Sequence, residues 1–155
     1  MNFFKLRLIF LANFFLITLS ACTEPDYYLY DGRQGSLQDF QGKWLVINYW
    51  ADWCPPCIKE MPELSEFYEL HRDEALVLAY NFDSLEGEEL EEQLIRFKVN
   101  IPSLLTDPKA LFGIESPESL PATYFISPNG HLKRPLIGPQ TKETLELFLE
   151  EFKKS

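Results

Sequence analysis

A pair of cysteines between a predicted strand and a predicted helix constrains this chain more than any other feature. Residues 44–49 are apolar, rich in β-branched and aromatic side chains, and predict a buried strand. A helical pattern follows from about residue 56 to residue 72, and Cys54 and Cys57 lie where the strand gives way to the helix. The sequence therefore predicts an α/β protein with two thiols at a helix N-terminus.

This position gives the two cysteines a definite chemistry. The free N–H groups and the positive dipole end of a helix favour negative charge. A cysteine there has a lowered thiol pKa, so we expect Cys54 to be partly thiolate near neutral pH. Cys57 can reach back within the first turn and close a disulfide, and Pro55 fits a turn where no N–H is needed. The motif predicts a redox-active disulfide that works without a cofactor.

The residues around the cysteines extend this motif into a family resemblance. Residues 42–57 read Gly-Lys-Trp-Leu-Val-Ile-Asn-Tyr-Trp-Ala-Asp-Trp-Cys-Pro-Pro-Cys, and residues 59–64 read Lys-Glu-Met-Pro-Glu-Leu. This run resembles the TlpA/ResA-like, membrane-tethered thiol–disulfide oxidoreductases, over residues 28–152. The resemblance implies a thioredoxin-like fold. Its central mixed sheet would be flanked by helices, with an N-terminal hairpin and an inserted helix and strand within residues 85–105.

Glu60 is the candidate for proton transfer. It follows Cys57 by three residues and so shares its helix face. A carboxylate near a thiol pair can take and give the protons that disulfide exchange requires, and the resemblance implies an active-site glutamate here. Thioredoxins proper carry a buried acid on the preceding strand, where this chain has Asn48, which cannot titrate. The alternative is a solvated surface glutamate.

The resemblance also implies a substrate-binding surface. In thioredoxin-like proteins the proline that opens a later strand is cis and lies against the cysteines, and Pro121 matches it. Leu120, just before it, would offer backbone groups to an extended substrate chain. We place Trp53 and Pro55 on the same surface, with Trp53 shielding one side of the disulfide and Trp50 packing in the core.

The N-terminus predicts export. Lys5 and Arg7 precede an apolar stretch, residues 8–19, that is short for a membrane span. Its end resembles the lipobox of bacterial lipoproteins, which implies cleavage before Cys22 and a lipid on that cysteine; the alternative is an uncleaved anchor. We therefore divide the chain into a signal peptide (1–21), a lipidated tether (22–26) and a thioredoxin-like domain (27–155).

The residue after the cysteine bears on location. Thr23 is not the aspartate associated with inner-membrane retention, so we expect a periplasmic, outer-membrane placement if the cell has an outer membrane.

Composition excludes several classes of protein. Asp and Glu outnumber Lys and Arg by 24 to 14, a net charge of −10, which speaks against nucleic acid or anionic lipid as a partner. With Cys22 lipidated, one cysteine pair remains, too few for a disulfide scaffold. A structural zinc site needs four ligands, and His71 and His131 lack ligand spacing, so we expect no metal.

These observations favour a reductase of disulfides in exported proteins, with a membrane thiol donor restoring the dithiol. By resemblance, the haem-binding cysteines of apocytochrome c are one candidate substrate. Two alternatives stay open: a disulfide-forming oxidase or isomerase that uses the same residues, and a metal- or haem-maturation thiol chaperone.

The remaining pattern predicts a second buried strand at residues 75–81, a helix capped by Ser84, a short strand at 101–105 and a short helix at 108–112. A strand then follows Pro121 and pairs through a turn with residues 131–136. Thr141 is expected to cap the last helix.

Overall fold

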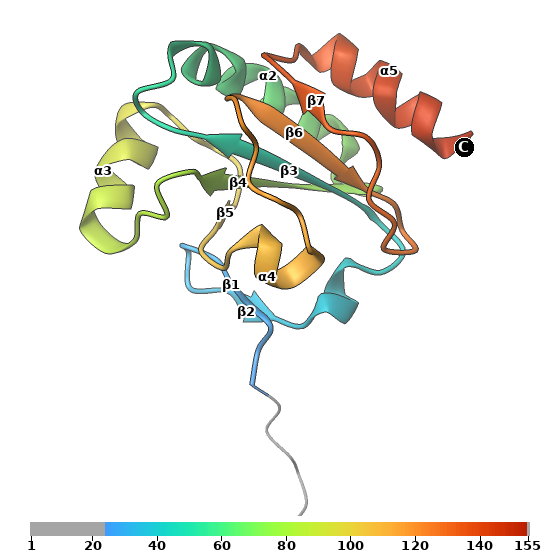
Figure 1. Ribbon diagram of the computed structural model, residues 1–155, viewed down its shortest axis with the longest axis horizontal. Helices are drawn as coiled ribbons and strands as arrows, with labels where there is room; N and C mark the ends of the chain where they lie inside the picture. Colours follow the sequence, from blue (N-terminus) through green and yellow to red (C-terminus); the bar gives the residue numbers. More distant parts are fainter. Residues whose placement is uncertain (1–23, 155) are drawn as a thin grey trace, which may run out of the picture.

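The computed structural model describes residues 24–154, and a fully buried strand, β3, lies at the centre of its main sheet (Figure 1). Along the chain the elements are β1 (Tyr27–Tyr28), β2 (Gln34–Gly35), the 3-10 helix η1 (Leu37–Phe40), β3 (Trp44–Trp50), α2 (Pro55–His71), β4 (Ala75–Asn81), α3 (Gly87–Arg96), β5 (Ser103–Leu104), α4 (Pro108–Phe112), β6 (Ala122–Ile126), β7 (Leu136–Ile137) and α5 (Lys142–Lys153).

The main sheet is mixed, with strand order β5-β4-β3-β6-β7. Strand β3 runs parallel to β4 and antiparallel to β6, and β4 runs parallel to β5. The short strands β1 and β2 form a separate antiparallel hairpin. This is the predicted thioredoxin-like architecture, with its N-terminal hairpin and with α3 and β5 as the inserted helix and strand.

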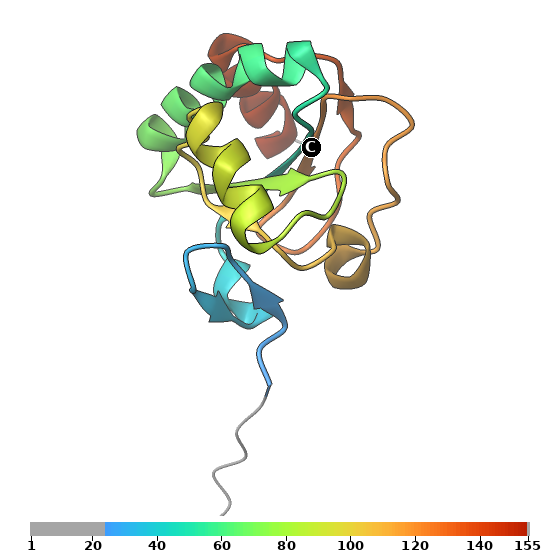
Figure 2. The same ribbon diagram turned by 90° about the vertical axis from the view of Figure 1, so that its left-hand side faces the viewer.

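The two faces of the sheet are covered by different elements (Figures 1 and 2). Helices α2, α3 and α5 pack on one face, whereas η1, α4 and the β1–β2 hairpin cover the other. Alternate residues of β3 pack against the elements on the two faces of the sheet, because successive side chains of a strand point to opposite faces. Val46 and Trp50 pack under α2, and Ile47 and Tyr49 pack on the opposite side.

Most predicted elements are confirmed within one or two residues. The central strand extends to Trp50, the helix after it begins one residue early at Pro55, and β4 and α4 have the predicted bounds. Thr141 is the N-cap of α5, and its side chain accepts a hydrogen bond from the backbone N–H of Thr144.

The predicted cap of α3 is wrong. The helix begins at Gly87 with Glu86 as its N-cap, two residues after the predicted cap. Ser84 lies in the preceding turn in a left-handed conformation, with φ of 55°, and its hydroxyl lies 2.9 Å from that of Tyr80. The carboxamide of Asn81 organises this turn by accepting from the backbone N–H groups of Asp83 and Leu85.

The hairpin after β6 differs in part from expectation. Leu132 makes only an isolated bridge to Ile126, and regular pairing resumes at Leu136 and Ile137. Pro135 in the intervening stretch has no N–H to donate to a ladder, which fits the interruption.

Two findings concern the membrane. Within residues 24–154 no helix has the length and apolar character required to cross a bilayer. The predicted signal peptide, residues 1–21, and the predicted lipid attachment at Cys22 lie outside the described residues, so both stay predictions.

Candidate active site

The cysteine pair forms a disulfide at the N-terminus of α2. Cys54 is the N-cap, and its Sγ accepts a hydrogen bond from the backbone N–H of Cys57 at 3.3 Å. Pro55 occupies the first helical position and is exposed. Cys57 is completely buried and Cys54 retains 4% of its surface, so Cys54 is the sulfur that an incoming chain meets first.

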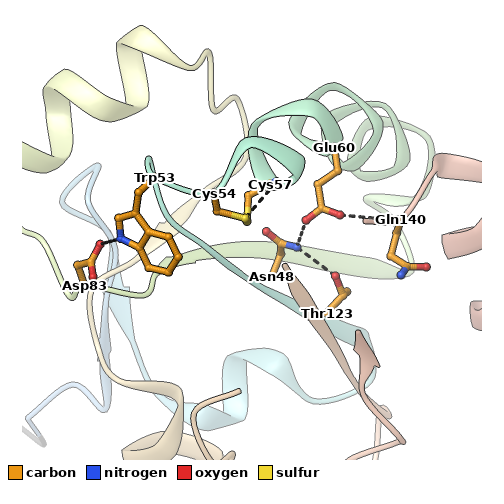
Figure 3. The surroundings of a disulfide bond; sticks show 8 residues. All are labelled: Asn48, Trp53, Cys54, Cys57, Glu60, Asp83, Thr123 and Gln140. Carbon is orange, nitrogen blue, oxygen red and sulfur yellow. Dashed lines mark hydrogen bonds between the residues drawn. A yellow bond between two sulfur atoms is a disulfide. The ribbon is translucent and has the colours of Figure 1, made fainter. Parts of the chain in front are cut away.

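Glu60 lies in the core, where a charged side chain is rare. Its Oε1 accepts from Asn48 Nδ2 at 2.7 Å, and its Oε2 accepts from the backbone N–H of Gln140 at 2.8 Å (Figure 3). Burial raises the pKa of Glu60 to about 7, and these two hydrogen bonds act in the opposite direction because they stabilise the carboxylate. The surface alternative for Glu60 is therefore wrong.

Asn48 links Glu60 to the sheet. It is fully buried on β3, directly opposite Thr123 of β6, and its Nδ2 also donates to Thr123 Oγ1 at 3.0 Å. One amide group thus connects α2, β3 and β6. Asn48 was recognised from the sequence as a residue that cannot titrate, but Thr123 was not predicted to belong to the site. Its polar side chain in an otherwise apolar strand could have indicated such a role.

Gln140 was also missed, because it acts through its backbone. The segment between β7 and α5 passes beside α2, where the N–H of Gln140 reaches Glu60. Its side chain folds back, and Nε2 donates to the carbonyl of Gly138. Nothing in the local sequence indicates that this amide serves a carboxylate 80 residues away.

Trp53 stands at the exposed edge of the site, with 59% of its surface accessible. Its Nε1 donates to Asp83 Oδ2 at 2.8 Å, and its ring meets Phe82 edge-on with centroids 6.0 Å apart (Figure 3). Asp83 was not predicted from the sequence, although its position indicates a place near the cysteines. Asp83 follows β4, and the carboxyl ends of the parallel strands β3 and β4 meet at one edge of the sheet.

Leu120 and Pro121 lie at the same edge. The Leu120–Pro121 bond is cis, as the resemblance implied. Strand β6 starts opposite the end of β3, with Ala122 paired to Tyr49, so Pro121 lies near the turn that carries the cysteines. Leu120 packs against the core cluster that includes both cysteines, and the carbonyl of Pro121 accepts from the N–H of Gly138 at 2.9 Å.

The other candidate residues lie away from the disulfide. His71 ends α2, where Nδ1 lies 2.8 Å from Glu74 and Nε2 lies 3.3 Å from Glu146, and His131 is exposed beside a turn. Among residues 24–154 no three His, Cys, Asp or Glu side chains are grouped as metal ligands.

Comparison with known proteins agrees with the family resemblance seen in the sequence. The model of the AhpC/TSA family matches residues 21–134. Thiol-disulfide oxidoreductase ResA of Geobacillus thermodenitrificans is 33% identical over 150 residues, covering 92% of this chain and 84% of that relative. Thioredoxin-like protein YneN of Bacillus subtilis is 32% identical over 130 residues, covering 81% of this chain and 76% of that relative.

Solved structures agree. StoA from Bacillus subtilis superposes with a TM-score of 0.63 at 25% identity, covering 81% of this chain and 98% of StoA. The pneumococcal exposed lipoprotein thioredoxin Etrx1 from Streptococcus pneumoniae superposes with a TM-score of 0.66 at 25% identity, covering 81% of this chain and 96% of Etrx1. With a closed disulfide at the start of α2 and relatives of this kind, the chain belongs to the AhpC/TSA family and is a thiol–disulfide oxidoreductase of the TlpA/ResA type.

Proposed function

We propose that the protein works as a reductase, which transfers two electrons from its dithiol to disulfides in exported proteins. The observation that carries the exchange mechanism is the buried Glu60, three residues after Cys57, with a pKa of about 7, and the reducing direction is the part of the proposal that the reduction potential tests. Reduction of a substrate is completed when Cys57 loses its proton and attacks. A carboxylate that accepts protons near neutral pH supports that step.

The reaction has two exchanges. The Cys54 thiolate, favoured by the N–H of Cys57 and the helix N-terminus, attacks one sulfur of a substrate disulfide and expels the other as a thiolate. Glu60 then takes the proton of Cys57, and the Cys57 thiolate attacks Cys54 Sγ. The second substrate sulfur leaves and is protonated. The substrate gains two electrons and two protons, one proton from Cys57 by way of Glu60 and one from solvent, and the enzyme ends as the Cys54–Cys57 disulfide.

The cycle requires a donor. The oxidised enzyme regains two electrons and two protons from an external dithiol, and a membrane thiol protein is the class of donor that suits a tethered enzyme. Substrate chains would approach over Trp53, Pro55, Leu120 and Pro121, and the segment before Pro121 would pair with them as an added strand.

The protein is also proposed to be exported and held at the membrane by a lipid on Cys22. Support comes from the basic residues and apolar stretch that precede Cys22 in the sequence. One structural neighbour, Etrx1, is described by name as an exposed lipoprotein. In a cell with two membranes, Thr23 favours the periplasmic side of the outer membrane.

The direction of exchange is tested by the reduction potential of the Cys54–Cys57 couple, measured by equilibration against a thiol buffer. We expect a value near that of thioredoxin, about −270 mV. A value near about −120 mV, that of the oxidant DsbA, would contradict the reductase and make the protein a disulfide-forming oxidase or isomerase. The Cys54→Ser variant provides the blank, because it has no couple to titrate.

The substrates are tested by trapping. In Cys57→Ser the first exchange proceeds but the second cannot, so we expect mixed disulfides between Cys54 and exported proteins on non-reducing gels. Cys54→Ser should abolish turnover, and the Cys54→Ser/Cys57→Ser double variant should capture nothing. Absence of any trapped partner in Cys57→Ser cells would contradict the proposed substrate class.

The proposed role of Glu60 in proton transfer predicts that the rate of exchange depends on pH. Because its pKa is raised to about 7, Glu60 holds its proton below that pH and serves as a base above it. We expect resolution of a mixed disulfide at Cys54 to accelerate through pH 7 in the natural protein, and to be slower by about 10²-fold or more in Glu60→Gln at pH 8. Stopped-flow single turnovers measure this step.

The matched control is Glu69→Gln, which changes an exposed carboxylate on the same helix. It should keep the rate and pH profile of the natural protein. Equal profiles for Glu60→Gln and Glu69→Gln would remove Glu60 from the mechanism.

The anchor is tested at Cys22. We expect Cys22→Ser to move from the membrane fraction to the soluble fraction and to lose incorporation of labelled fatty acid. Retention of the variant in the membrane fraction would contradict the lipid anchor and favour an uncleaved N-terminal segment.

A further inference from the structure

One polar atom beside the disulfide has no partner in the oxidised protein. Asn48 is completely buried, and its amide nitrogen donates to Glu60 and Thr123, but its carbonyl oxygen Oδ1 accepts no hydrogen bond. Buried acceptors without a partner are uncommon in native proteins and call for an explanation.

The direction of this oxygen supplies the explanation. Asn48 lies between Val46 and Trp50 on the face of β3 that packs under α2, the face whose core cluster also holds Cys54 and Cys57. In Figure 3 the amide nitrogen points to Glu60 and Thr123, whereas the oxygen points to the disulfide. Neither sulfur of a disulfide carries a proton, so neither can donate to that oxygen in the oxidised state.

We propose that Asn48 is a positioning residue for the reduced enzyme, and that its Oδ1 accepts a hydrogen bond from the Cys57 thiol. Cys57 is the donor because it is the more deeply buried sulfur and shares its helix face with Glu60, which Asn48 contacts. The Sγ of Cys54 instead receives the N–H of Cys57, an arrangement that suits a thiolate.

Two consequences follow from this contact. Asn48 holds the resolving thiol beside Glu60, so that thiol, amide and carboxylate form one continuous chain: Cys57 S–H to Oδ1, and Nδ2–H to Glu60 Oε1. The oxygen is satisfied only when the disulfide is open, so the contact favours the dithiol over the disulfide. The inference rests on the dithiol form, which both directions of exchange share, and stands independently of the proposed direction.

The test is the S–H stretching band of a single-thiol protein, since a thiol that donates a hydrogen bond absorbs at lower wavenumber than a free thiol. In the Cys22→Ser/Cys54→Ser protein, which leaves Cys57 as the only cysteine of the chain, we expect the Cys57 band at low wavenumber. Adding Asn48→Leu should move it to higher wavenumber, and Asn48→Val provides the same test in a smaller side chain that suits a strand. Adding Asn48→Asp keeps an oxygen at the same place and should keep the band low.

Two controls separate this contact from a general disturbance. Thr123→Val removes the other partner of the Asn48 amide nitrogen without touching Oδ1, and should leave the Cys57 band in place. In the Cys22→Ser/Cys57→Ser protein, measured at a pH low enough to protonate Cys54, the band of Cys54 should not respond to Asn48→Leu. A Cys57 band that ignores both Asn48→Leu and Asn48→Val, or moves equally in Thr123→Val, would overturn the proposal.

The equilibrium between the dithiol and the disulfide supplies a second readout, in the protein that keeps both Cys54 and Cys57. Loss of the contact removes a stabilising interaction from the dithiol form alone. Asn48→Leu should therefore shift the equilibrium with a thiol buffer about tenfold toward the disulfide, a fall of about 30 mV in reduction potential. A potential that is unchanged or higher would contradict the proposed contact even if the natural potential lies at the oxidase end.

Discussion

The hydrogen bond between Asn48 and Glu60 joins the helix that carries the cysteines to the central strand beneath it. A carboxylate in this apolar layer is unfavourable unless its oxygens are satisfied, and here one accepts from Asn48 and the other from the backbone of Gln140. Burial raises the pKa of Glu60, and the two hydrogen bonds limit that rise, so the pKa of Glu60 is about 7. The position of the β7–α5 connection is tied to the same carboxylate.

The sequence predicted the elements around this contact because their signals are local. Residues 44–50 are buried on both faces, and the residues after them combine an N-cap cysteine with a proline in the first turn. Ser84 shows where local reasoning fails. Serine is a good N-cap, yet the Asn81 side chain already organises the turn by accepting from two backbone N–H groups, and the helix starts later.

The site itself was predicted only in part, because its polar contacts join distant segments. The cysteines are three residues apart, and the helix period places Glu60 beside Cys57. The partners of Glu60 and Asn48 lie elsewhere: Thr123 is paired across the sheet, and Gln140 contributes a backbone N–H that no side-chain pattern reveals. Glu60 was expected to act in proton transfer, but its burial followed only from the packing of α2 on β3.

The environments of the two sulfurs explain how one residue type takes two roles. Cys54 lies at the end of the helix with an N–H directed at its Sγ, which stabilises negative charge and suits a nucleophile. Cys57 lies deeper, in apolar surroundings that favour a neutral thiol, with Glu60 one helical turn along the chain. A thiol that stays protonated until a base removes its proton is a poor nucleophile, so the first attack on the substrate falls to Cys54, and Cys57 attacks only after the mixed disulfide has formed. In the proposed reductase mechanism, the different environments of Cys54 and Cys57 set the order of the two exchanges.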